Sequence, residues 1–138
     1  MDLKGIINIS GKSGLFKIIS EGKNLLVVES LVDGKKSPLH SSNQATLLEE
    51  IGVYTYEDTK PLQDIFNIIA KKEDGKQTIS HKSSKNELEK YFREILNNYD
   101  EDRVYTSDIK RIFQWYNIIH KKGLIQEENK KKTSNHKI

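Results

Sequence analysis

The N-terminal part of the chain alternates short apolar runs with glycine-centred turns. Apolar runs begin at Ile6 and at Leu15, and a third run, rich in valine, covers 25–32. Runs of this length and composition are typical of β-strands. Asp33-Gly34 predicts the tight turn of a hairpin, because both residues tolerate a positive φ. The strand that follows must be an edge strand or end in a bulge, because Pro38 has no backbone N–H.

The residue composition changes in the next segment, from one that favours strands to one that favours a helix. Residues 42–50 predict one or two helical turns, and residues 53–55 predict a last short strand. Five short strands with a helical turn before the last one are the order of an SH3-like small β-barrel. Many unrelated proteins use such barrels, so the barrel alone indicates no function.

From Thr59 onward the apolar residues follow the helical period, and three amphipathic helices are predicted. Ser84 and Glu87 have the spacing of a capping box at the start of the second helix. The three helices begin at Pro61, after Ser84 and after Thr106 or Ser107, and they end before Asp74-Gly75, at Asn97-Asn98 and before Gly123.

These elements predict an α+β protein, with an N-terminal five-stranded SH3-like small β-barrel followed by a three-helix C-terminal unit. We expect a barrel domain at 1–58, a helical domain at 59–125 and a disordered basic tail at 126–138. Halves of about 60 residues bury too little surface to be stable alone. We therefore expect the two halves to pack against each other.

The third predicted helix carries the candidate partner-binding residues. Its main apolar stripe contains Ile109, Ile112, Phe113, Tyr116, Ile119 and His120. Trp115 and Ile118 lie off this stripe, on the side that carries Lys110 and Arg111. Two interpretations are open: the helix is central and the barrel covers Trp115, or Trp115 is an exposed anchor for another protein, a role in which Trp and Arg are common.

A second, weaker candidate surface lies in the front half. Tyr54 and Tyr56 alternate along one strand and share a face, where they could stack on the bases of RNA or single-stranded DNA. The formal net charge is +3, and basic and acidic residues are interleaved along the chain. This pattern is not that of a protein with a basic face for duplex DNA.

No pattern indicates catalysis, a cofactor or a metal. The chain has no cysteine and four histidines, none of them at a metal-ligand spacing. Gly11-Lys12-Ser13 lacks the glycine spacing of a phosphate-binding loop. There is no secretion signal at Met1 and no apolar run long enough for a membrane span, so we expect a cytoplasmic protein without a membrane partner.

Part of the sequence resembles a known family. The matching segments are 1–12, 28–30, 33–35, 103–110 and Trp115-Tyr116, although Ser13 stands where a proline is expected. Over 1–122 the chain resembles a family of conserved small cytosolic proteins of Bacteroidetes, which is classed as a domain of unknown function. The resemblance implies no activity and no catalytic residues. We therefore expect a non-enzymatic interaction or adaptor module that binds another protein, with RNA or single-stranded DNA binding as the alternative.

Overall fold

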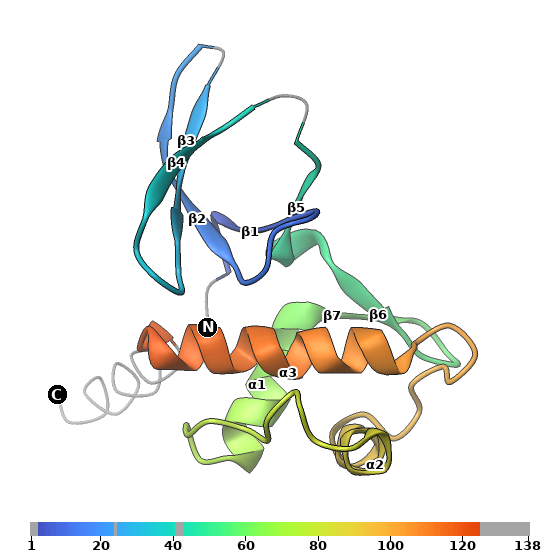
Figure 1. Cartoon of the computed structure of the whole chain (residues 1–138). Helices are drawn as coiled ribbons and strands as arrows, with labels where there is room; N and C mark the ends of the chain where they lie inside the picture. Colours follow the sequence, from blue (N-terminus) through green and yellow to red (C-terminus); the bar gives the residue numbers. More distant parts are fainter. Residues whose placement is uncertain (1–2, 24, 41–42, 125–138) are drawn as a thin grey trace, which may run out of the picture.

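The computed structural model describes residues 3–23, 25–40 and 43–124, so the predicted tail at 126–138 lies outside the described residues. Figure 1 shows α3 crossing the molecule between the N-terminal sheet and the other two helices. The elements are β1 (Ile6–Ile9), β2 (Phe16–Glu21), β3 (Leu26–Ser30), β4 (Lys36–Leu39), β5 (Ala45–Leu47), the 3-10 helix η1 (Leu48–Glu50), β6 (Gly52–Tyr54), β7 (Thr59–Pro61), α1 (Leu62–Lys72), α2 (Lys85–Ile95) and α3 (Thr106–Lys121).

The first five strands form one antiparallel sheet in the order β4-β3-β2-β1-β5. The fold class is therefore α+β, as predicted, and residues 3–124, apart from the short gaps, contain five strands in this sheet and three α-helices. Within the described residues β4 and β5 are the two edges and do not pair with each other, so the sheet is open and the predicted barrel is not confirmed. Pro38 lies in β4, and its placement on an edge strand is confirmed.

The predicted position of the fifth strand was wrong. Residues 45–47, expected to be helical, form β5 and pair with β1, where Leu47 faces Ile7. The helical turn follows as η1, and the segment expected to be the last strand of the barrel pairs with β7 instead. Pairing with β1 overrides the local helix propensity of this segment. The predicted domain boundary at 58/59 stays a prediction; it lies in the turn between β6 and β7.

A shared hydrophobic core joins the sheet to the helices, so the expectation that the halves pack together is confirmed. It includes Leu3, Ile6, Leu15 and Leu31 from the N-terminal half, together with apolar residues of α1, α2 and α3. A smaller cluster fills the opposite face of the sheet and consists of Ile7, Ile9, Phe16, Val28 and Leu39. The pleat explains this division, because successive residues of β1 point to opposite faces.

The predicted capping box at the start of α2 is confirmed. The backbone N–H of Glu87 donates to the Ser84 hydroxyl at 3.2 Å, and the backbone N–H of Ser84 donates to the Glu87 carboxylate at 3.3 Å. Replacing Ser84 by alanine is expected to lower the free energy of unfolding by about 1 kcal/mol, because the N–H of Glu87 loses its acceptor. Urea denaturation measures the change. Ser83→Ala is the matched control, and equal effects of the two substitutions would contradict the role of the cap.

Candidate functional site

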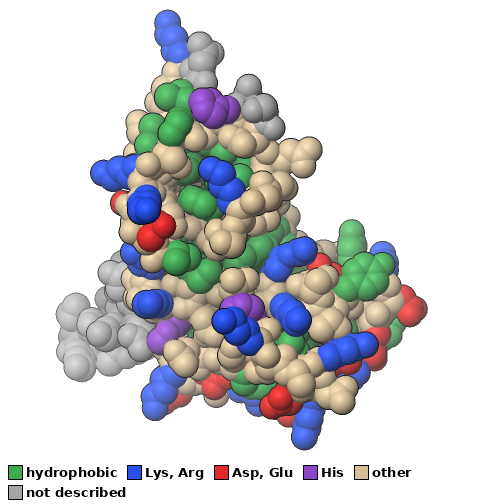
Figure 2. Space-filling model, in the orientation of Figure 1, with side chains coloured by type: hydrophobic (Ala, Val, Ile, Leu, Met, Phe, Trp, Pro, Cys, Tyr) green, Lys and Arg blue, Asp and Glu red, His purple; other side chains and the backbone are tan. Residues whose placement is uncertain are grey.

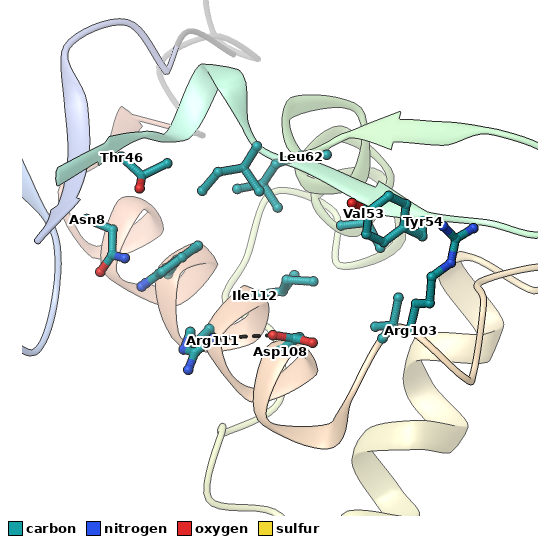
Figure 3. A pocket seen from close by; sticks show the side chains of 13 residues that line it. Asn8, Thr46, Val53, Tyr54, Leu62, Arg103, Asp108, Arg111 and Ile112 are labelled. Atoms are coloured by element: carbon teal, nitrogen blue, oxygen red, sulfur yellow. Dashed lines mark hydrogen bonds and ion pairs between the residues drawn. The ribbon is translucent and has the colours of Figure 1, made fainter. Parts of the chain in front are cut away.

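A pocket of about 300 Å³ lies between the sheet and α3 (Figure 3). Asn8 and Thr46 line it from the sheet, and they are cross-strand partners of β1 and β5, so their side chains share a face. Asn8 is a polar residue between Ile7 and Ile9, and the pleat turns it toward α3 while both isoleucines point to the other face. Trp115 of α3 also lines this pocket.

Apolar side chains form the inner wall of the pocket. Val53 of β6, Leu62 of α1 and Ile112 of α3 line it and are all buried. Gly52 lines the pocket next to Val53, and because glycine has no side chain this contact is made by its backbone. The wall is therefore suited to an apolar group, with backbone atoms at one edge.

Two arginines line the pocket, and each forms an ion pair. Arg111 Nη1 lies 3.2 Å from Asp108 Oδ1, and Arg103 Nε lies 2.8 Å from Asp100 Oδ2. The hydrogen bond from Arg103 holds the pKa of the Asp100 carboxyl below its usual value. The Arg103 guanidinium also lies over the ring of Tyr54, 4.3 Å from its centroid. Both arginine side chains remain 57% exposed, so part of their hydrogen-bonding capacity faces solvent.

The start of α3 explains why Asp108 and Arg111 lie at this place. Asp108 accepts the backbone N–H of Tyr105 at 2.9 Å, so the carboxylate is tied to the first turn of the helix. Arg111 follows three residues later, within reach of it. The helix begins earlier than predicted, with Tyr105 rather than Thr106 or Ser107 at the cap position.

The structure separates the four residues predicted on the third helix. Trp115 is only 7% exposed, so it is covered as the central-helix interpretation requires and is not an exposed anchor. Trp115 and Arg111 share the pocket, whereas Lys110 is exposed on the helix. Ile118 is half-buried and lines a separate shallow hollow with Val32. Their role in binding a partner stays a prediction.

The two predicted tyrosines also differ. Tyr54 lies at the pocket beneath Arg103, and Tyr56 is 62% exposed with its hydroxyl accepting the backbone N–H of Glu101 at 3.3 Å. Tyr54 ends β6, and Tyr56 follows it in a turn that contains two exposed carboxylates, Glu57 and Asp58. Figure 2 shows hydrophobic and acidic side chains next to each other at this end of the molecule. Base stacking would therefore take place close to several negative charges.

Most residues of the pocket were not identified from the sequence, among them the polar residues Asn8, Thr46 and Arg103. The sequence does contain a signal for Asn8, because a polar residue interrupts an otherwise apolar strand on the face that carries Ile6. It contains no signal for Thr46, because the segment around Thr46 was predicted to be helical. Arg103 had none either, because only the folded chain brings the loop before α3 next to Tyr54.

No candidate metal site or membrane span is found in the part of the chain that the structure describes. Within it, no three His, Asp or Glu side chains converge in a way that could hold a metal ion. None of its helices is both long enough and apolar enough to cross a bilayer.

Comparisons with known proteins confirm the family resemblance. Residues 51–119 match the family described as Domain of unknown function (DUF6852), and residues 3–48 match Domain of unknown function (DUF5606). A Bacteroides vulgatus protein, solved by solution NMR as a structural-genomics target, is 41% identical with a TM-score of 0.73, and the similarity covers 89% of each chain. No curated protein matches the chain. The chain therefore belongs to the family described as Domain of unknown function (DUF6852), and the Bacteroides vulgatus protein is a relative of it.

Proposed function

We propose that the protein is a non-enzymatic binding module that holds a segment of another protein in the pocket between the sheet and α3. The observation that carries this proposal is a single pocket that combines a buried apolar wall with two half-exposed arginines. Arginine is enriched among the residues that dominate binding at protein interfaces.

The size of the pocket favours one or two side chains over a large ligand. A cavity of about 150 Å³ already holds benzene, and ligand pockets for drug-sized molecules begin at about 300 Å³. At about 300 Å³ this pocket has room for an aromatic or branched apolar side chain. Val53, Leu62 and Ile112 supply the apolar surface that such a side chain would contact.

The arginines favour a carboxylate next to that apolar side chain. Each guanidinium has five N–H donors, and one aspartate uses only some of them. Arg103 and Arg111 can therefore each donate to a further oxygen atom while they keep their ion pairs. An acidic side chain that neighbours an apolar residue satisfies both parts of the pocket.

RNA or single-stranded DNA is the weaker candidate. Tyr54 and Tyr56 are exposed, but only Tyr54 belongs to β6, and Glu57, Asp58 and Glu101 lie close to them. Phosphates would be repelled by these carboxylates, and affinity for nucleic acid depends on replacing counterions with basic side chains. The lack of cysteine is consistent with a cytoplasmic setting for a protein partner.

Site-specific crosslinking tests the proposal. A photo-reactive amino acid is placed at Thr46, which is exposed and lines the pocket, in cells that make the protein. We expect a crosslinked species that protease digests and nuclease does not, and we expect Arg111→Ala to reduce its yield. Ala45 is the matched control position, because it is the exposed neighbour on β5 whose side chain points to the other face.

Two results would contradict the proposal. One is an equal yield of the same species from positions 45 and 46, which would indicate contact without a pocket. The other is a crosslinked species sensitive to nuclease alone, which would favour the nucleic-acid alternative.

A further inference from the structure

We infer that Gly52 recognises the main chain of the bound segment, which adds as a short strand to the free edge of β6 and places an apolar side chain in the pocket. This inference rests on the proposed function and specifies its partner as an extended segment. In this segment the apolar residue has an acidic neighbour.

The register of the β6–β7 hairpin determines where the backbone of Gly52 points. Gly52 faces Pro61, and Val53 faces Lys60. The neighbouring residues Ile51 and Leu62 are hydrogen-bonded, because the backbone N–H of Leu62 donates to Ile51 O at 2.9 Å. Hydrogen-bonded and non-hydrogen-bonded pairs alternate along an antiparallel ladder, so Gly52 and Pro61 form a non-hydrogen-bonded pair. The N–H and C=O of Gly52 therefore point away from β7, and no partner for either group is found among the described residues.

This free edge faces the pocket. Further along the same edge of β6, the N–H of Asp100 donates to Tyr54 O at 2.9 Å, so part of the edge is already paired within the chain. Beyond that pair the chain turns away, and Gly52 lines the pocket through backbone atoms alone. An unpaired donor and acceptor on one residue match the N–H and C=O of one residue in an added strand.

Charge and shape extend the match beyond the backbone. Arg103 lies over Tyr54, which shares a face of β6 with Gly52, so a carboxylate on the residue paired with Gly52 has a positively charged group within the site. The apolar neighbour of that residue points to the other face, which carries Val53. A bulkier residue than glycine at position 52 is opposed by the neighbouring strand, because an added Cβ would lie 2.4 Å from Thr59 Cγ2. Because Thr59 lies so close, position 52 carries no side chain beside its free N–H and C=O.

A pair of small peptides tests this inference on the full chain. The probe is N-acetyl-aspartyl-phenylalanine N-methylamide, and its control carries a methyl group on the aspartyl nitrogen, which removes the donor to Gly52 O. We expect the probe to shift the NMR signals of the Gly52 amide and the Trp115 indole N–H at millimolar concentration. We expect the control to bind about fivefold more weakly, the value of one net hydrogen bond.

A matched pair of protein variants tests the other hydrogen bond. Thr59→Ser removes the methyl group that opposes a side chain at position 52. In that background Gly52→Pro removes the backbone N–H, whereas Gly52→Ala retains it. We expect the probe to bind about fivefold more weakly to the proline variant than to the alanine variant. Proline is tolerated on a strand edge whose N–H is unpaired, and the peptide pair tests the inference if this variant does not fold.

The outcomes separate this inference from the proposed function. Absence of probe binding at millimolar concentration, or equal binding of both peptides, would overturn main-chain recognition at Gly52. If crosslinking from Thr46 still captures a protein in that case, the pocket binds its partner through side chains. If crosslinking fails while the probe binds as expected, the pocket accepts peptides but the proposed cellular role is wrong.

Discussion

Trp115→Ala is expected to lower the free energy of unfolding by about 3 to 5 kcal/mol, the usual cost of removing a buried aromatic side chain. Trp115 is 7% exposed and belongs to the core that joins the sheet to the helices. A loss of this size approaches the total stability of a small domain. Urea denaturation followed by circular dichroism measures the change.

A conservative variant and a spectroscopic measurement accompany this substitution. Trp115→Phe keeps an apolar ring in place and is expected to cost less than Trp115→Ala. The chain has one tryptophan, so its fluorescence reports on this position alone and is expected to be blue-shifted in the native state. Red-shifted emission together with a loss below about 0.5 kcal/mol, as for surface substitutions, would contradict the burial of this side chain.

Asn117→Ala is expected to lower the free energy of unfolding by about 2 to 4 kcal/mol. The Asn117 carboxamide accepts the backbone N–H of Thr78 at 2.8 Å and donates to the carbonyl oxygens of Thr78 and Ile79 at 3.3 and 3.1 Å. This side chain holds the connection between α1 and α2 against α3. Alanine leaves several backbone groups without partners, and each unsatisfied group costs about 1 to 3 kcal/mol when buried.

The control for this substitution is Gln114→Ala, because Gln114 is half-buried on the same helix and one turn away. Thermal and urea unfolding of both variants give the comparison. Equal losses of stability would show that water replaces the hydrogen bonds of Asn117. In that case the connection between α1 and α2 is held by other contacts.

Local signals in the sequence predicted the elements whose ends depend on nearby residues. The capping box of Ser84 and Glu87 lies where the spacing placed it, and Gly123 follows the end of α3 with a φ of +79°. The apolar stripe from Ile109 to Ile119 predicted the buried face of α3. Each of these features involves residues only three or four positions apart, so the chain alone contains the information.

Features that depend on distant residues were not predictable in the same way. Residues 45–47 have a composition that favours a helix, and they form a strand because they pair with β1. The strand at 53–55 was expected, but its partner was not, because β7 begins with Thr59 in a segment assigned to the helical half. The pocket depends on the same pairings. Trp115 and Arg111 were identified as candidates, whereas Thr46 and Arg103 required the folded chain.

The pocket is built from both halves of the chain, and this has a thermodynamic consequence for any molecule that occupies it. Asn8 and Thr46 come from the sheet, whereas Ile112 and Trp115 come from α3. A ligand that contacts both walls binds only while the halves remain docked, so binding and domain docking are linked equilibria. At a free concentration of 100 times its dissociation constant, such a ligand adds about 2.7 kcal/mol to the stability of the native state. Occupancy is then measured as a rise in melting temperature that grows with the concentration of the ligand.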